Sequence, residues 1–234
     1  MPTRSLGSRA ALVLASLPVA TLALPLAAQR ATVPDIGPYL IADGAAEVAL
    51  ARSAAPKAIS DSATVLVLRR TGFVEGAHGS NGFTCAVFRS FGGPLNDPDF
   101  WDPHVRAPHC FNSAAASTVL PAMLKQTELV LAGQSRAAIG ARIEHGYATH
   151  EFPSPAPGAM AYMLSPEQTL TSSGSHWMPH LMFYYDKSLP ASMWGAGDNS
   201  APVIDGSASD PHAPVLTLFV PVRRWSNGAL ALGK

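Results

Sequence analysis

The chain carries few charged residues. Lys, Arg, Asp and Glu make up 14% of its 234 residues, and 16 basic residues balance 16 acidic ones. A protein that binds the phosphate backbone of DNA or RNA needs a basic stripe or patch, and the sequence has none. The composition therefore argues against nucleic acid as a partner.

Several motifs and long apolar stretches are also lacking. The chain has no HExxH, no Walker-type loop and no convincing dinucleotide-binding fingerprint, so these kinds of chemistry have no support. Beyond the first 28 residues, no stretch is long and apolar enough to span a bilayer. Proline (21 residues) and glycine (19 residues) are abundant instead, which predicts many loops and short regular elements.

The N-terminus has the pattern of an export signal. Arg4 and Arg9 precede an apolar run over residues 10–24, and small residues up to Ala28 suit a signal peptidase. We expect cleavage after Ala28 and a protein that is periplasmic or extracellular. Because no cysteine follows the apolar run, we do not expect a lipid anchor of the bacterial lipoprotein kind.

Export decides how the two cysteines, Cys85 and Cys110, are interpreted. Disulfides persist in oxidising compartments, so we expect these two residues to be bonded. Closing a loop of about 25 residues would contribute roughly 3 kcal/mol to stability in the chain-entropy model. The alternative is a reactive thiol beside His109, but adjacency in sequence does not give a Cys-His pair the geometry that catalysis needs.

Hydrophobic periodicity predicts one α+β domain with a mostly antiparallel sheet of about five or six strands and about three helices. Its organisation is a signal peptide at 1–28, a linker and helix at 29–62, and the remainder of the domain at 63–234. The first strands should form an antiparallel meander. The expected helices are 39–52, 113–131 with a break at Pro121, and 135–147; the expected strands are 64–70, 72–75, 83–90, 158–165, 181–185 and 215–222, with an ordered aromatic loop at 91–108.

Residues 174–186 hold the densest collection of reactive side chains. Pro179 disfavours a helix there, and the aromatic run that follows favours a strand whose side chains alternate between two faces. If the chain is already extended at His176, then His176, Met178 and His180 share one face. The alternative is one histidine hydrogen-bonded in the core and the other at the start of the strand.

A small-molecule or partner-binding module is the leading function, because aromatic walls with a few polar groups are the usual composition of a binding pocket. An enzyme that uses His180 as acid or base is the alternative, and aromatics that merely complete the core of a structural envelope protein are a third interpretation. A small molecule or an envelope component is the expected partner. The ligand-binding candidates are His176, His180, Trp177, Tyr184, Trp194 and Trp101.

A metal site is a further alternative. His176 and His180 would supply two ligands for zinc or copper, with Met178 and Met182 favouring copper(I). The third ligand would come from His104, His109, Asp186 or a distant carboxylate.

Four segments, taken in order, form a recognisable pattern: NGFTC (81–85), PHCFN (108–112), GAMAYML (158–164) and HWMPHLM (176–182). In this pattern the chain resembles a group of exported bacterial proteins to which we can attach no activity. The resemblance implies export, pairing of the two cysteines and a single domain. Relatives often have His-x-His-Pro-His, whereas Met178 stands at the middle position here, which weakens a three-histidine metal site.

Overall fold

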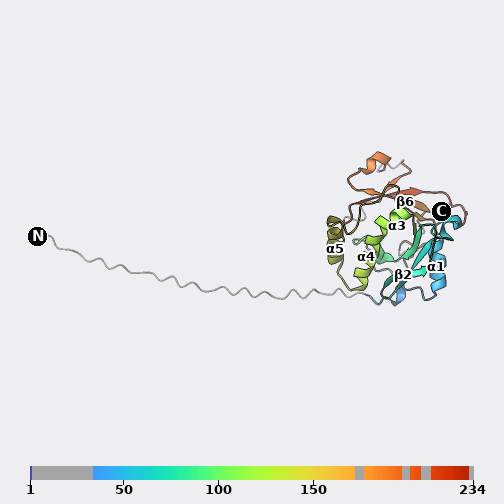
Figure 1. Cartoon of the computed structure of the whole chain (residues 1–234), viewed down its shortest axis with the longest axis horizontal. Coiled ribbons are helices and arrows are strands. Elements are labelled where there is room, and N and C mark those ends of the chain that lie inside the picture. Colours follow the sequence, from blue (N-terminus) through green and yellow to red (C-terminus); the bar gives the residue numbers. More distant parts are fainter. Residues whose placement is uncertain (2–33, 172–176, 197–200, 207–211, 232–234) are drawn as a thin grey trace.

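The computed structural model describes residue 1 and residues 34–171, 177–196, 201–206 and 212–231. Within them the chain forms an α+β fold around one eight-stranded sheet (Figure 1). The strand order is β2-β1-β3-β4-β5-β6-β8-β7, with β1 and β3 parallel and the other neighbours antiparallel. The predicted signal peptide lies, apart from Met1, outside the described residues. No helix in the described ranges is long and apolar enough to cross a bilayer.

The regular elements are more numerous than predicted, so the expected counts of helices and strands are wrong. The described α-helices are α1 (Gly44–Arg52), α2 (Lys57–Ser60), α3 (Ser113–Thr118), α4 (Leu120–Leu131) and α5 (Arg136–Ala148), and the 3-10 helices are η1 (Gly37–Tyr39), η2 (Ser90–Gly92) and η3 (Ala191–Trp194). The strands are β1 (Thr64–Arg69), β2 (Gly72–Ala77), β3 (Thr84–Phe88), β4 (Ala107–Phe111), β5 (Met160–Met163), β6 (His180–Asp186), β7 (Ile204–Asp205) and β8 (Val215–Pro221).

Side-chain caps decide where the helices begin. Asn112 accepts a hydrogen bond from the Ala115 amide and so caps α3, as the sequence predicts. The first helix begins at Gly44 rather than at Tyr39, because the Asp43 carboxylate accepts the Ala45 amide and stops the helix from extending backwards.

The first three strands do not form the predicted antiparallel meander. β2 returns along β1 as a hairpin, but β3 lies on the other side of β1 and runs parallel to it, with Val65 opposite Cys85. Val65 and Val67 of β1 are buried. Pairing on both edges satisfies the backbone groups of this buried strand, which explains why the chain crosses over instead of continuing as a meander.

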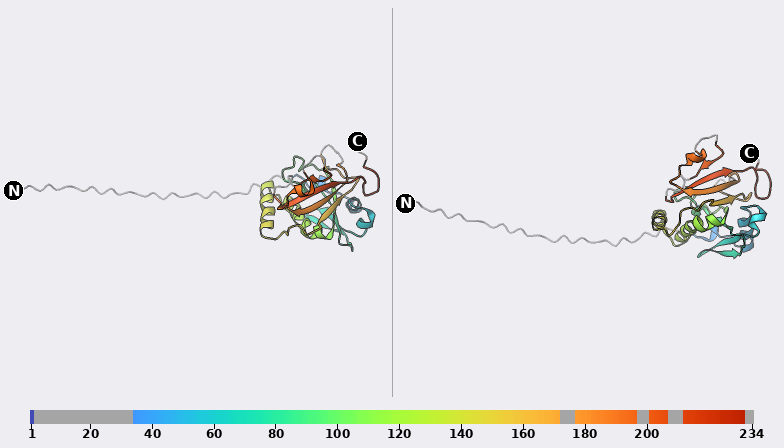
Figure 2. Two further views of the ribbon diagram at one scale, coloured as in Figure 1. Left: turned by 90° about the horizontal axis from the view of Figure 1, so that it is seen from above. Right: turned by 45° about the horizontal axis from the view of Figure 1, so that its top comes forward.

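Helices cover both faces of the sheet. On one face, Val87 of β3 packs with Ala51 and Ala54 near α1. On the other face, Phe111 of β4 packs with Ala115 of α3 and with the start of α4. Figure 2 shows the C-terminal strands, orange to red, at one edge of the sheet and the cyan N-terminal elements towards the other.

The disulfide between Cys85 and Cys110 is confirmed, with an S–S distance of 2.01 Å. The two residues are direct partners of β3 and β4. The alternative of a reactive thiol beside His109 is therefore wrong, since Cys110 is bonded. Because side chains alternate along β4, His109 points to the opposite face from the disulfide.

The proline-rich loop before β4 is ordered by its aromatic residues, as predicted. Phe91 and Phe100 are buried, and the Trp101 ring lies against both. The Tyr39 hydroxyl donates to the Trp101 carbonyl at 2.6 Å, which ties the loop to η1.

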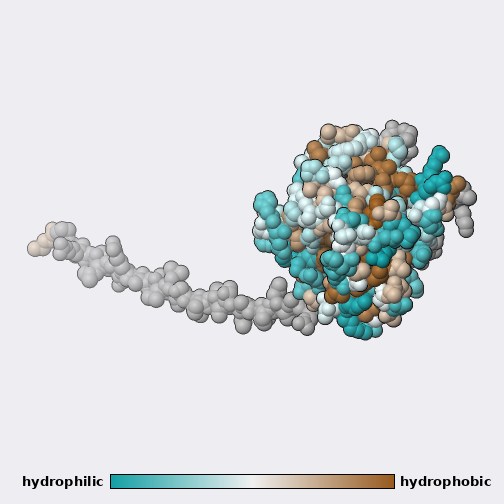
Figure 3. Space-filling model, turned by 45° about the vertical axis from the view of Figure 1, so that its right-hand side comes forward, coloured by the Kyte–Doolittle hydropathy of each residue, from teal (hydrophilic) through white to brown (hydrophobic). Residues whose placement is uncertain are grey.

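Most large apolar side chains are inside the molecule. The surface in Figure 3 mixes hydrophilic and hydrophobic residues. The exposed large hydrophobic residues, within the described ranges and apart from Met1, are Val74, Trp177, Met178, Leu189, Met193, Ile204 and Leu230.

Candidate functional site

Two buried histidines stand in one row across the sheet. Met163 of β5 is the direct partner of His180 on β6, so both point to the same face. Cys110 of β4 pairs with Tyr162, which places His109, one residue along, opposite Met163 in the same register. His109, Met163 and His180 therefore follow one another on three neighbouring strands, on the face that α3 and α4 cover.

Each histidine ring is held by a hydrogen bond to the backbone carbonyl two residues before it. The Nδ1 atom of His109 donates to the Ala107 carbonyl at 2.9 Å, and the Nδ1 atom of His180 donates to the Met178 carbonyl at 2.9 Å. A carbonyl oxygen can only accept, so Nδ1 carries the proton in both rings. The Nε2 atom of each ring is left for another partner.

Burial keeps both rings neutral. It lowers the pKa of His109 to about 4, with nearby His180 adding in the same direction against the hydrogen bond to Ala107. Burial also lowers the pKa of His180, against the hydrogen bond to Met178. At neutral pH the two side chains are therefore uncharged bases rather than proton donors.

The histidines line a cavity of about 420 Å³ between the sheet and the helices. This volume lies within the range of small-molecule sites. The sheet contributes His109, Met163, His180, Met182, Tyr184 and Phe219. The helical side contributes Val119, Ala122, Met123, Gln126, Ile143 and Tyr147.

Rings surround His180. Its imidazole meets Trp177 edge-on with the ring centroids 4.7 Å apart, and meets Phe219 in the same way at 5.4 Å. Burial raises the pKa of the Tyr184 hydroxyl, which donates weakly to the Met182 sulfur at 3.5 Å. The cavity is thus an aromatic and methionine-rich space with few polar groups.

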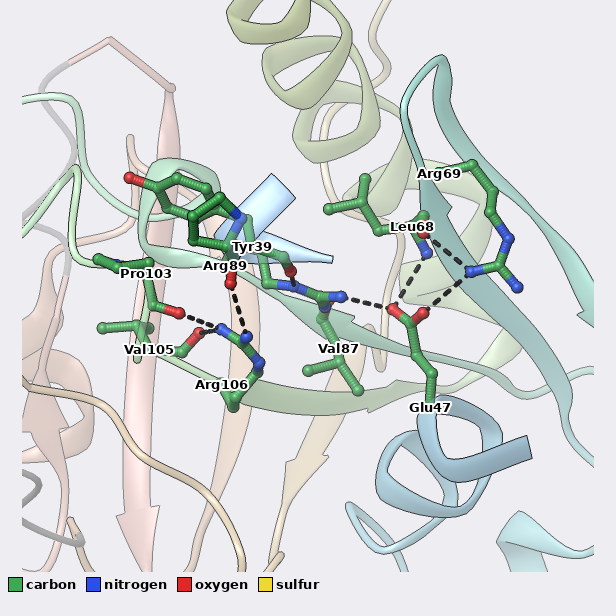
Figure 4. Close-up of polar contacts among 10 residues, drawn as sticks. Tyr39, Glu47, Leu68, Arg69, Val87, Arg89, Pro103, Val105 and Arg106 are labelled. Carbon is green, nitrogen blue, oxygen red and sulfur yellow. Dashed lines mark hydrogen bonds and ion pairs between the residues drawn. The ribbon is translucent and has the colours of Figure 1, made fainter. Parts of the chain in front are cut away.

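One member of a buried ion pair lines the cavity. Arg89, which lines it, donates to Glu47 Oε1 at 2.7 Å, to the Tyr39 carbonyl at 2.7 Å, and to the Val87 carbonyl (Figure 4). Glu47 comes from α1 and also accepts Arg69 Nη1 at 3.2 Å. Burial lowers the pKa of Arg89, and the Glu47 carboxylate opposes that shift. Each of the three guanidinium nitrogens already has a partner, so Arg89 forms part of the cavity lining rather than a free group for a ligand.

Only some of the predicted site residues come together. Trp177, His180 and Tyr184 line the cavity. Trp194 packs on Tyr185 instead, on the other face of β6, and Trp101 lies against Phe91 and Phe100 in the loop. His176 lies outside the described residues.

Met178 was expected to share the face of His180 only if the chain is already extended at His176, which lies outside the described residues. Met178 is 45% exposed whereas His180 is 1% exposed. The strand begins at His180, so the alternation of side chains does not extend back to Met178. The Met178 carbonyl, rather than its sulfur, is what His180 contacts.

No group of three or more His, Cys, Asp or Glu side chains within the described ranges is arranged to hold a metal ion. Two of the proposed third ligands have other partners, since His104 is paired with Asp102 and Asp186 accepts from Ser154 and Ser188.

His109 is the site residue that the sequence left least defined, as one of several third ligands or a neighbour of Cys110. The neighbouring Cys110 indicated the direction of the His109 side chain. A disulfide on one face of β4 directs the preceding side chain to the other face. Gln126 and Met163 had no such signal, because helix α4 and strand β5 approach His109 only through the tertiary fold.

The chain was compared with protein-family models, with curated proteins and with solved structures, and none of them matches it. Function has to be inferred from the cavity and its side chains.

Proposed function

We propose that this protein binds a small molecule in the cavity between His109, His180 and helix α4. The observation that carries the proposal is the pair of buried, neutral histidines that face a largely apolar cavity of about 420 Å³. Their Nδ1 atoms bond backbone carbonyls, which leaves the two Nε2 atoms as the acceptors for a ligand.

The charge state of the histidines argues against a role as general acid. A general acid works best when its pKa lies near the operating pH. Burial lowers the pKa of His109 to about 4 and lowers that of His180 too, so neither ring holds a second proton at neutral pH. The rings suit hydrogen-bond acceptance from a ligand.

We also propose that the protein works after export. The disulfide supports this, because such bonds persist in the periplasm and outside the cell and are rare in the cytosol. The ligand would then be a molecule of the envelope or of the surroundings.

The cavity is tested with N-phenyl-1-naphthylamine, a dye that fluoresces in apolar sites. We expect saturable binding of one dye per chain. Ala122→Phe adds a ring to a buried residue that lines the cavity, and we expect it to weaken dye binding at least tenfold. Ala137→Phe makes the same change at an exposed position of α5 and should leave binding unchanged.

Two results would count against the proposal. One is a wild-type protein that binds no dye at millimolar concentration. The other is equal dye binding by the Ala122→Phe and Ala137→Phe variants, since the dye would then sit elsewhere. Circular dichroism of each variant shows whether the fold is kept.

A further inference from the structure

The two histidines offer acceptors, not donors, to whatever occupies the cavity. A neutral imidazole carries one proton, and in both rings Nδ1 uses it to bond a backbone carbonyl. Each Nε2 is therefore an unprotonated acceptor. Within the part of the chain that the structure describes, neither Nε2 receives a hydrogen bond.

A third acceptor comes from helix α4. The side-chain nitrogen of Gln126 donates to the Phe91 carbonyl at 2.9 Å and to the Gly93 carbonyl at 2.6 Å. Two carbonyls can only be met by the NH₂ group, so this contact settles the orientation of the amide. The Gln126 oxygen is left over, again as an acceptor.

The cationic side chain in the wall of the cavity is already paired, because the Arg89 guanidinium bonds Glu47. On the loop side the wall carries the carboxylates of Asp97 and Asp99. An anionic ligand would therefore enter this mainly apolar space without a free counter-charge, which disfavours it.

The spacing of the strands sets the spacing of the donors that a ligand needs. His109 and His180 lie two strands apart, so their backbones are separated by about 9.5 Å. Side chains stand roughly perpendicular to a sheet, so we expect the two Nε2 atoms to lie about 9.5 Å apart. Two hydrogen bonds of about 2.8 Å each, inclined to the line that joins these atoms, then leave about 4–5 Å between the donor atoms of a ligand that bridges them.

We infer, on the basis of the function proposed above, that the cavity selects a ring compound without negative charge that carries two hydrogen-bond donors about 4–5 Å apart. A dihydroxy-substituted aromatic ring is the simplest such compound. Its hydroxyls donate to His109 and His180, and its ring lies against Trp177 and Phe219, whose rings already meet each other edge-on at 5.1 Å.

The test compares two probes on the wild-type protein by calorimetric or NMR titration. Resorcinol has two hydroxyls in a 1,3 arrangement, and 1,3-dimethoxybenzene has the same ring and oxygens without donor hydrogens. We expect resorcinol to bind at least about tenfold more tightly, because the methoxy compound leaves both acceptors unpaired.

A pair of variants assigns the effect to the ring nitrogen. In His180→Asn the side-chain amide can still donate to the Met178 carbonyl, but it has no atom where Nε2 lies. This variant should therefore lose most of the preference for resorcinol. Gln reaches further, and its side-chain oxygen accepts, so His180→Gln should keep part of the preference. His109→Asn and His109→Gln repeat the comparison at the other end.

The outcomes separate this inference from the proposed function. Dye binding with equal affinity for the two probes overturns the ligand class but leaves the cavity as a binding site. Absence of dye and probe binding overturns both. Stoichiometric binding of Zn²⁺ or Cu⁺ to the wild type, lost in His109→Asn, would also overturn the inference, since the metal would then use the Nε2 atoms. The comparison of probes on the wild type stays decisive if a variant does not fold.

Discussion

Acidification from pH 7 to pH 5 is expected to lower the free energy of unfolding by about 2 kcal/mol through His109 alone. Burial lowers the pKa of this residue to about 4 in the folded chain, against about 6.5 in the unfolded chain. Between these values the unfolded chain binds a proton that the folded chain does not. The stability is therefore complete above about pH 6.5 and is lost as the pH falls towards 4.

The magnitude follows from the two pKa values. Each pH unit below 6.5 costs about 1.4 kcal/mol for one proton, and the loss approaches about 3 kcal/mol near pH 4. His180 adds in the same direction, because burial lowers its pKa too. Carboxylates titrate mainly below pH 5, so the window from pH 7 to pH 5 isolates the histidines.

The assay is urea unfolding followed by tryptophan fluorescence at pH 7, 6 and 5. His109→Gln removes the titrating ring, so its loss of stability over this window should be smaller than that of the wild type by about 2 kcal/mol. Met163→Leu, in the same row of the sheet, has no titrating group and should follow the wild type. Equal pH dependence in His109→Gln and the wild type would refute the reasoning.

Three further perturbations test what stabilises the fold. Reduction of the Cys85–Cys110 bond should lower the free energy of unfolding by about 3 kcal/mol, from the loop of 25 residues that it closes, measured by urea unfolding with and without reductant. Glu47→Gln leaves Arg89 buried without a counter-charge and should cost about 3–5 kcal/mol. Gly79→Ala should lower the melting temperature strongly, because the added Cβ would lie 2.0 Å from the backbone nitrogen of Thr64.

Matched changes serve as controls. Asp61→Asn breaks an exposed ion pair with Lys57 and should cost less than about 1 kcal/mol, so a similar cost for Glu47→Gln would contradict the importance of burial. Gly44→Ala brings its Cβ to 3.1 Å from the flexible end of Arg69 and should have little effect compared with Gly79→Ala. Unchanged stability on reduction would show that the disulfide constrains little.

Much of the local structure could be predicted from the sequence. Asn112 caps a helix that begins at residue 113, where the predicted helix begins, and α5 lies within one residue of the predicted helix at 135–147. A cap depends on a hydrogen bond within three residues, so it is a local property of the sequence. The continuous apolar run of β1 indicated a buried strand. The position of β3, parallel to β1 on its other side, could not be predicted, because nothing in the apolar run shows which edge of β1 the next strand will pair with.

The candidate site could be predicted only in part. The sequence pointed to Trp177, His180 and Tyr184, which stand together in one segment and line the cavity. It also pointed to Trp101 and Trp194, which pack in the loop and on the far face of the sheet. Aromatic side chains serve in cores and in pockets alike, so their type does not tell which of the two they join.

The sequence by itself determined several local features of the chain. These are the pairing of the two cysteines, the start of capped helices and the buried strands, since each depends on neighbouring residues or on composition. Only the tertiary structure decided the site. His109 and His180 are 71 positions apart, and they line one cavity because β4, β5 and β6 pair in one register. That register, together with the burial that keeps both rings neutral, is a property of the assembled sheet and its covering helices.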